Sequence, residues 1–406
     1  MCNKDFPQVP LALGAPDLTP PSRRMKPDPK AFHQGLQVSS VPSCGWVSLK
    51  RYLAPDADKK DRGSVTATET ALENEFLRVE LNEYGELVSI YDKQIDRELL
   101  AERSNLFRMY KNVPAVCDAW DIESMYAETP VQLSSEPAQI ELLAQGPLVG
   151  MIRIKRKLNN SILTQEISLR RGKRRIDFIT TIDWQEKHKL LKVCFVPDIH
   201  AHQAIHEIQF GHLPRPNHFS RPSDAARFEV AQQKWSALAE ENRGFALLND
   251  CKYGVSSCGK AINLTLLRSP LAPDPRADAG VQQFTYSAYA WNGSFAECAV
   301  VREAYDLNVP VSLKQGQAED RSLLSIDAPN IIVESVKPAQ DGSPDIVIRL
   351  YEAKRMATRC ELLCQLPYVR AVDANMLEET TGAEYSGGKL ILNFRPFEIK
   401  TLRLCQ

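Results

Sequence analysis

The feature that most restricts the fold of this chain is a long series of short segments in which apolar and polar residues alternate, with polar turns between them. Apolar side chains take alternate positions of segment 77–81, and the polar residues 82–85 separate it from a return segment, 87–91. The same pattern continues through segments 151–158, 163–169 and 176–184. A period of two places apolar side chains on one face of a β-strand, and short turns join antiparallel neighbours. The sequence therefore predicts an all-β protein with antiparallel sheets, not βαβ units.

Length and changes in composition predict two β-domains behind an irregular start. A chain of 406 residues exceeds one ordinary core. Segment 1–70 is rich in proline, and only residues 40–53 suggest a short strand pair. We expect a large β-domain over 71–312 and, after a polar linker, a smaller β-sandwich over 313–406. The one candidate for a substantial helix is 224–241, although its apolar residues follow no single period.

Charge and cysteine usage exclude several classes of partner. The 50 basic and 51 acidic residues nearly cancel, which argues against nucleic acid or an anionic membrane surface. A basic run at 170–175 brackets Gly172 and is typical of a solvated hairpin tip. No apolar stretch reaches the roughly 20 residues of a membrane-spanning helix, and the first 21 residues do not resemble a signal peptide. The 10 cysteines lack zinc-site spacing, which predicts free thiols in a cytoplasmic protein.

Motifs for common chemistries are absent from the sequence: it has no phosphate-binding loop, dinucleotide-binding glycine motif, zincin helix or nucleophile elbow. Three polar groups remain as candidates. The first sets Trp120 among Asp118, Asp121 and Glu123. An aromatic plate with carboxylates suits the apolar face and the hydroxyls of a sugar. A turn that merely solvates its acids is the commoner arrangement of these residue types.

The other two groups also leave alternatives open. His206, Glu207 and His212 are spaced irregularly for a metal site, and hydrogen-bonded structural histidines are the commoner arrangement. Arg268 leaves an apolar segment and enters a proline-rich loop that carries Asp274 and Asp278. It can present a rigid fork to a ligand, or it can pair with one of these aspartates and pin the loop. On residue types alone the two arrangements are equal.

A family resemblance covers about residues 71–406, in order and without large gaps. Its motifs lie at 72–74, 87–92, 118–121, 188–193, 207–212, 226–230, 247–254, 267–270 and 397–402. These motifs resemble the C-terminal part of glycoside hydrolase family 38 α-mannosidases, in particular the cytosolic branch. The resemblance implies a galactose-mutarotase-like β-supersandwich over 71–312 and a smaller C-terminal β-sandwich.

The resemblance also implies what the chain would do. In the family, an N-terminal α/β-barrel holds the zinc ion, its ligands and the nucleophile of a retaining mechanism, and nothing in this sequence matches those motifs. The chain would therefore complete a mannoside-binding cleft with a barrel as its partner, and would carry no catalytic residue, metal ligand or cofactor of its own. The residues that the resemblance assigns to substrate binding are Arg268, Asp118, Trp120 and Asp121, with Asp274 and Asp278 shaping the loop.

Departures from the family and two other functions complete the expectations. Relatives usually carry an aspartate, an aromatic residue and a histidine at the positions of Asn112, Cys117 and Gln282. A stand-alone carbohydrate-binding or scaffold protein is one alternative. A mutarotase-like epimerase, with His212 and Glu229 as its acid and base, is the other. Full-length relatives often assemble, so a homo-oligomer is expected by analogy.

Overall fold

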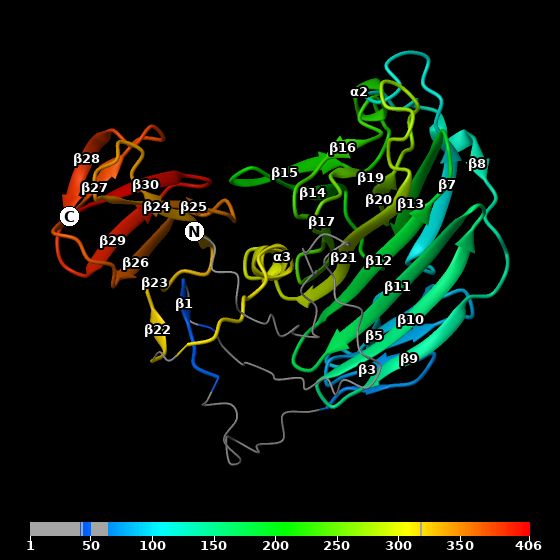
Figure 1. Cartoon of the computed structure of the whole chain (residues 1–406), viewed down its shortest axis with the longest axis horizontal. Coiled ribbons are helices and arrows are strands. Elements are labelled where there is room, and N and C mark those ends of the chain that lie inside the picture. Colours follow the sequence, from blue (N-terminus) through cyan, green and yellow to red (C-terminus); the bar gives the residue numbers. More distant parts are fainter. Residues whose placement is uncertain (1–40, 42–43, 50–63, 317–318) are drawn as a thin grey trace. The chain divides into compact units, whose positions relative to one another are not determined.

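The computed structural model describes residues 41, 44–49, 64–316 and 319–406, and most of the irregular segment expected at 1–70 lies outside these residues. The chain divides into two compact units (Figure 1). Of the described residues, the first unit comprises 64–207 and Leu213–Leu313. The second unit comprises the described residues of the C-terminal segment from Lys314, residues 41 and 44–49, and the short segment Ile208–His212. Strands dominate both units, so the prediction of an all-β protein is confirmed.

The first unit contains a nine-stranded sheet. Its strands, in spatial order, are β15 (Gly211–Pro216), β14 (Gln203–Ile208), β17 (Trp235–Ala239), β18 (Arg243–Asn249), β21 (Gly280–Asn292), β12 (Arg175–Trp184), β11 (Ser161–Arg170), β10 (Val149–Leu158) and β9 (Gln139–Gln145). From β14 to β9 every pair of neighbours is antiparallel. The predicted segments 151–158, 163–169 and 176–184 thus form β10, β11 and β12, side by side.

Two further sheets accompany it in the first unit. The six-stranded sheet has the order β16 (Val230–Ala231), β19 (Gly254–Cys258), β20 (Ala261–Leu267), β13 (Lys189–Phe195), β7 (Leu106–Lys111) and β8 (Pro130–Val131). The five-stranded sheet has the order β2 (Thr66–Ala67), β3 (Ala71–Glu73), β4 (Leu77–Leu81), β5 (Leu87–Asp92) and β6 (Arg97–Glu98). β4 follows the predicted alternation of inward apolar and outward polar residues, whereas β13 is buried over most of its length.

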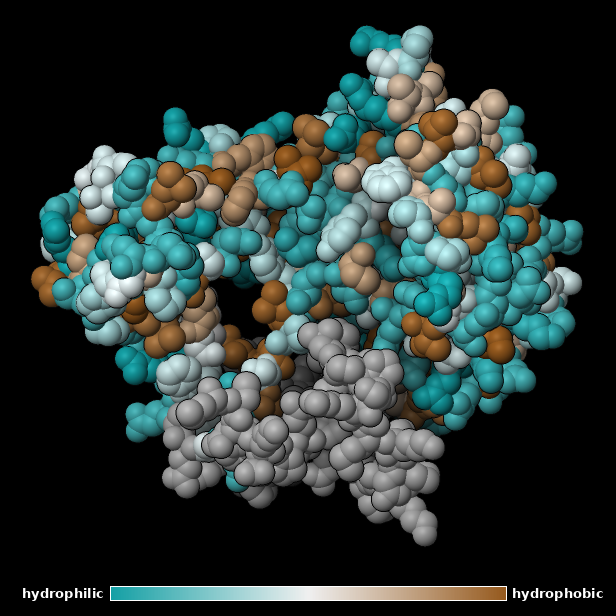
Figure 2. All heavy atoms as spheres, turned by 45° about the horizontal axis from the view of Figure 1, so that its top comes forward, coloured by the Kyte–Doolittle hydropathy of each residue, from teal (hydrophilic) through white to brown (hydrophobic). Residues whose placement is uncertain are grey.

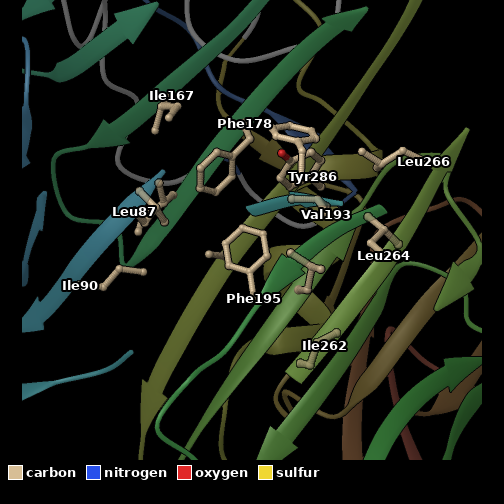
Figure 3. Packing of buried hydrophobic residues seen from close by; sticks show 14 of the residues in the cluster. Leu87, Ile90, Ile167, Phe178, Val193, Phe195, Ile262, Leu264, Leu266 and Tyr286 are labelled. Atoms are coloured by element: carbon tan, nitrogen blue, oxygen red, sulfur yellow. The ribbon is translucent and has the colours of Figure 1, made fainter. Parts of the chain in front are cut away.

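One apolar core joins the three sheets of the first unit. Phe178 of β12 and Tyr286 of β21 stack with ring centroids 5.2 Å apart, and Phe195 of β13 meets Phe178 edge-on at 5.6 Å. Figure 3 shows these rings between side chains of all three sheets, including Leu87 of β5 and Ile262 of β20. The sheets therefore share one continuous hydrophobic interior, which is what makes this unit a sandwich.

The second unit has a separate core and separate sheets. Its five-stranded sheet has the order β24 (Ile331–Pro338), β25 (Ile346–Glu352), β30 (Ile399–Cys405), β27 (Arg370–Ala374) and β28 (Thr380–Tyr385). Its three-stranded sheet has the order β23 (Leu324–Ile326), β26 (Thr358–Cys364) and β29 (Lys389–Phe394), and β1 (Gly45–Trp46) pairs with β22 (Arg321–Ser322). The part of the expected strand pair at 40–53 that the structure describes is β1.

The predicted helix over 224–241 is wrong. Its span holds only the end of α2 (Pro222–Ala225), followed by β16 and β17. Most of β17 is buried on both faces, and a strand without a solvent face shows no alternation from which it could be recognised. The longer helix of the described residues is α3 (Val300–Asn308), which turns Val300, Val301, Ala304 and Leu307 inward at helical spacing. That spacing was the available signal.

The basic run is a hairpin tip, as predicted, but its last two arginines are not solvated. The tip joins β11 to β12, and Gly172 supplies a positive φ of 74°. Arg174 pairs with the buried Asp92. Arg175 is buried and contacts Asp177 at 2.7 Å and Glu303 of α3 at 3.0 Å. These arginines fasten the nine-stranded sheet to its neighbours and are not available to an external partner.

Candidate functional site

Three neighbouring strands of the six-stranded sheet bring the predicted polar residues to one edge. Lys111 pairs with Lys189, and Leu191 pairs with Leu267, so the ends of β7 and β20 meet the start of β13. The amide of Asn112 donates to the His188 carbonyl at 2.9 Å, and the amide of His188 donates to the Ser269 carbonyl at 2.9 Å. We call the group formed by Asn112, residues 118–121, His188, Arg268, Ser269 and Asp278 the strand-end site.

Arg268 holds the loop 118–121 in place. Its guanidinium donates to the carbonyl oxygens of Ala119 (3.1 Å), Asp118 (3.0 Å) and Asp121. Burial lowers the pKa of Arg268, although the neighbouring carboxylates of Asp118 and Asp278 oppose this shift. The sequence left open whether this arginine binds a ligand or pins a loop. In the structure it pins a loop, through backbone carbonyls instead of the aspartates considered.

Asp118 ties the same loop to the proline-rich segment after β20. Its Oδ2 accepts from the amides of Leu271 (2.7 Å) and Ala272 (3.2 Å) and lies 3.0 Å from His188 Nε2. Hydrogen bonding, led by the Leu271 amide and joined by His188, holds the pKa of Asp118 below its usual value. The carboxylate is therefore an anchored anion that fixes the distance between two loops.

The two loop-shaping candidates differ in reach. Oδ2 of Asp278 accepts from the backbone amides of Arg268 (2.9 Å) and Ser269 (3.0 Å), so this carboxylate caps the end of β20. Asp274 Oδ1 accepts from the amide of Arg276 at 2.9 Å, which is a bond within its own turn. The structure thus brings Asp278 into the strand-end site and leaves Asp274 in a local turn.

Trp120 and Asp121 form the exposed end of the site. Trp120 is 73% exposed, and the amides of both residues donate to the carbonyl of Cys117 at 2.8 and 2.9 Å. The indole is therefore presented to solvent from a tight turn. A rigid exposed aromatic plate beside a carboxylate can bind the apolar face and a hydroxyl of a sugar.

Backbone strain and unsatisfied polar atoms concentrate here. Cys117, His188, Ser269 and Asp278 all have a positive φ, between 47° and 61°. Asn112 is 2% exposed, and neither its amide oxygen nor its amide nitrogen has a hydrogen-bond partner. Buried Oδ1 of Asp118 and Nε of Arg268 also lack partners. Such strain costs on the order of 1–3 kcal/mol per residue and typically gathers at functional sites.

The three departures from the family lie at different distances from this network. Asn112 belongs to the network, and its buried side-chain amide has no hydrogen-bond partner. Cys117 is an exposed thiol that begins the Trp120 turn. Gln282 donates from Nε2 to the Asp278 carbonyl at 3.2 Å, which links it to the strand-end site through one residue.

A buried ion pair on the same sheet was missed from the sequence. Lys192 of β13 is 1% exposed, its ammonium pairs with Glu229, and it lies 5.2 Å from the centre of the Tyr126 ring. Thr265 donates to the same glutamate. The available signal was a row of polar residues, Arg108, Lys192 and Thr265, each between two apolar neighbours in its strand. Glu229 gives no such signal because its partners are distant in sequence.

The epimerase alternative gains nothing from the geometry. Glu229 is already engaged by Lys192 and Thr265. His212 belongs to the second unit, where its Nδ1 donates to the Ala353 carbonyl at 3.2 Å and its ring meets Phe397 edge-on. Glu229 therefore makes its contacts in the first unit, and His212 makes its contacts in the second unit.

Metal ligands and membrane spans were sought among the described residues. Among these residues, no three His, Cys, Asp or Glu side chains gather where they could hold a metal ion. None of the described helices has the length and apolarity to cross a membrane. The face shown in Figure 2 is mostly hydrophilic, with apolar residues in small groups among polar ones.

The fold places the chain in the class of all-β proteins, with a large antiparallel β-sandwich and a smaller one. Residues 72–276 match the glycosyl hydrolases family 38 C-terminal domain. Residues 330–402 match the glycosyl hydrolases family 38 C-terminal beta sandwich domain. The chain belongs to glycosyl hydrolase family 38 and forms its C-terminal part.

Individual relatives agree with the family assignment. The chain is 36% identical to alpha-mannosidase 2C1 of Homo sapiens over 400 residues, which is 93% of this chain and 38% of that protein. It is 35% identical to alpha-mannosidase G of Dictyostelium discoideum over 82% of this chain and 32% of that protein. The chain therefore spans less than half the length of these relatives.

Solved structures agree in fold. An alpha-mannosidase from Enterococcus faecalis V583 superposes with a TM-score of 0.67 at 19% identity and covers 84% of this chain and 43% of that one. A glycosyl hydrolase family 38 protein from Enterococcus faecalis gives a TM-score of 0.69 over the same share of this chain and 45% of its own. At this identity the likeness supports the fold alone.

Proposed function

We propose that this chain forms the C-terminal wall of a mannoside-binding cleft in a retaining, zinc-dependent α-mannosidase whose catalytic groups lie on an N-terminal barrel. The observation that carries the proposal is the strand-end site, where strained backbone, orphaned polar atoms and an exposed tryptophan coincide in a chain of this family. Alone, the chain is inactive, because a retaining glycosidase needs a nucleophile and an acid/base carboxyl about 5 Å apart. The barrel would supply both of these groups and the zinc.

Within the site, the contacts divide the work between two kinds of residue. Trp120 stacks on the sugar ring, and the Asp121 carboxylate accepts from its hydroxyls. Arg268 and Asp118 act as positioning residues, because their bonds hold the backbone that carries Trp120. Asp278 shapes the end of β20, whereas Asp274 only stabilises its own turn. The three carbonyls occupy three of the five N–H donors of Arg268, so direct sugar contact would use one of the donors that remain.

The test compares the 406-residue chain alone with the same chain joined to a family 38 barrel, using a chromogenic α-mannoside. We expect hydrolysis only in the joined protein, and a KM raised roughly tenfold by Trp120→Ala, since stacking on one aromatic ring contributes about 1–2 kcal/mol. Leu377→Ala, which removes an exposed apolar side chain in the second unit, is the matched control. Equal kinetics of Trp120→Ala and the unaltered joined protein would refute the assignment of the cleft wall.

Calorimetry on the chain alone separates this function from the carbohydrate-binding alternative. The proposal predicts no saturable heat with methyl α-mannoside, because one wall of a cleft cannot bury enough of the sugar. Saturable binding that Arg268→Ala abolishes would instead identify a stand-alone carbohydrate-binding protein.

Location and assembly belong to the same proposal. We place the protein in the cytoplasm, which is supported by nine free cysteines among the described residues, four of them buried. Cell fractionation tests this directly. A homo-oligomer is proposed by analogy with the family, and sedimentation of the joined protein tests it.

A further inference from the structure

A second polar cavity lies in the first unit, and it shares no residue with the strand-end site. Its volume is about 480 Å³. It is lined by residues of β7, among them Arg108 and Tyr110, by the turn before β5 and by Arg156 of β10. The charged residues that line it are Glu86, Arg103, Arg108 and Arg156, so the lining carries two more positive than negative charges.

Arg156 is a buried guanidinium with little compensation. Its side chain is 7% exposed. Nη1 donates to the Tyr84 carbonyl at 3.0 Å, whereas Nε is buried and has no partner. The carboxylate of Glu86 stands 3.9 Å away, beyond hydrogen-bond length. Burial accordingly lowers the pKa of Arg156, and the attraction of Glu86 offsets this only in part.

Glu86 is committed to other groups. Its Oε2 accepts from Asn82 Nδ2 at 2.9 Å and from Arg103 Nη1 at 3.0 Å. Arg108 has no carboxylate partner within salt-bridge distance in the part of the chain that the structure describes. Arg156 therefore has its nearest carboxylate only at 3.9 Å, and the partly buried Arg108 has none among the described residues, so the lining keeps an excess of positive charge.

The remaining lining resembles a small-molecule site. The lining also includes Ser134, Ser135 and Tyr110, which carry hydroxyls, and the apolar residues Phe107 and Val131. Cavities of about 300–1,000 Å³ hold small organic ligands. Planar guanidinium groups match phosphate and carboxylate oxygens in paired hydrogen bonds, and the combination of hydroxyls with an apolar surface suits a sugar ring.

We propose that this cavity binds a phosphorylated monosaccharide, with Arg108 and Arg156 on the phosphate and the hydroxyl-bearing residues on the sugar. The proposal does not depend on the mannosidase assignment, because it uses none of the same residues. Phosphate fits better than a single carboxylate, because two charges on the ligand would balance the two excess charges of the lining.

Calorimetric titration of the 406-residue chain at low ionic strength tests the proposal, with inorganic phosphate, glucose 6-phosphate and glucose as probes. We expect saturable binding of both phosphates, tighter for the sugar phosphate, and none of glucose. Arg108→Gln should weaken binding at least tenfold, and so should Arg156→Lys, which keeps the charge but loses the fork. Arg108 is only partly buried, so its variant should keep the fold, as circular dichroism can verify.

Arg78→Gln is the matched control, because Arg78 is an exposed arginine that already pairs with Glu80 outside the cavity. Its affinity for glucose 6-phosphate should equal that of the unaltered chain. Absence of saturable binding would overturn the proposal. An equal loss of affinity for glucose 6-phosphate in Arg78→Gln would also overturn it, because that result would indicate non-specific charge attraction. A dicarboxylate that binds as tightly as the sugar phosphate would overturn it as well.

Discussion

At the scale of single residues, the unusual feature is a buried amide that bonds to nothing. Asn112 is as buried as Asn74, at 2% exposure each. Asn74 donates to the carbonyls of Arg170 and Lys173 and accepts from the amides of Phe76 and Leu77, so its amide is fully satisfied. A buried polar group without partners costs about 1–3 kcal/mol. That cost falls on a residue of the strand-end site.

The two asparagines therefore respond oppositely to the same substitution. Asn112→Leu should leave the free energy of unfolding unchanged or raise it by about 1 kcal/mol, because it removes an unsatisfied group. Asn74→Leu should lower it by about 2–4 kcal/mol, because it strands four backbone groups. Urea unfolding of both variants measures the difference. A loss of stability in Asn112→Leu equal to that in Asn74→Leu would show that the Asn112 amide is bonded in solution.

The strand-end site allows a second prediction at this scale. Arg268→Lys keeps a positive charge but cannot bridge the carbonyls of Asp118, Ala119 and Asp121 together. We expect the amides of residues 119–121 to exchange with deuterium at least tenfold faster, while those of β20 stay protected. Arg276→Lys, a change in the turn made by Asp274, is the control. Unchanged exchange in Arg268→Lys would mean that the loop does not depend on the guanidinium.

Whether the sequence could predict a contact of the site depends on how far apart the two partners lie along the chain. Arg268 and the 118–121 loop were predictable as neighbours, because ordered family motifs mark both. The direction in which the Arg268 guanidinium points could not be predicted from the sequence. Its three acceptors are backbone carbonyls about 150 residues away, and no side-chain pattern marks them. The Lys192–Glu229 pair was missed because a buried ion pair needs a partner that no local pattern reveals.

At the scale of elements, the pairing of β14 with β17 contains a titratable group. His206 lies directly opposite Ser236, and its Nδ1 is 2.7 Å from Ser236 Oγ. The Ser236 hydroxyl donates to Gln232 Oε1 at 3.2 Å, so the histidine donates to the serine. Burial, together with the charge of Arg215, lowers the pKa of His206 to about 4. The strand pair thus requires a neutral imidazole.

The lowered pKa of His206 determines how folding stability changes with pH. An unfolded histidine titrates near its model value of 6.5, so between pH 6.5 and about 4 the unfolded chain binds a proton that the folded chain refuses. Stability is therefore complete above pH 6.5 and falls as the pH drops towards 4. His206→Gln should reduce this fall by on the order of 3 kcal/mol. Urea unfolding at several pH values measures it, with the exposed His202→Gln as a control that should change nothing.

Elements were predicted well where one face meets solvent and poorly where none does. β4, β10, β11 and most of β12 show the alternation that predicted them, whereas β5 buries Leu87, Ile90 and Asp92 and does not alternate strictly. β17 is largely buried on both faces and was taken for a helix. β28 gives no alternation for the opposite reason: five of its six residues are exposed, so it lacks an apolar face.

At the scale of the whole molecule, the chain has two separate hydrophobic cores, one in each compact unit. Leu163 belongs to the first core and is 1% exposed, and Leu350 belongs to the second and is 0% exposed. Separate cores of this kind can unfold as separate cooperative transitions. The change of composition near residue 313 is a sequence signal for a domain boundary, whereas no sequence signal indicates that Ile208–His212 groups with the second unit.

Differential scanning calorimetry of the full chain should accordingly show two transitions. Leu350→Ala should lower the midpoint of one transition, and Leu163→Ala that of the other, each through a loss of about 2–5 kcal/mol from the cavity created. A single transition that both variants shift together would contradict independent unfolding.

The turn between β14 and β15 has a consequence for the order in which the molecule can be completed during translation. Phe210 packs edge-on against Tyr351, and His212 bonds to Ala353, which lies 141 positions further along the chain. Ribosomes add roughly 5–20 residues per second, and contacts across such separations form late. For several seconds after the first sandwich has left the ribosome, this turn therefore has no partner. A nascent chain that stalls before residue 351 exposes the Phe210 ring to chaperones, because Tyr351 and Ala353 are the residues that this turn contacts.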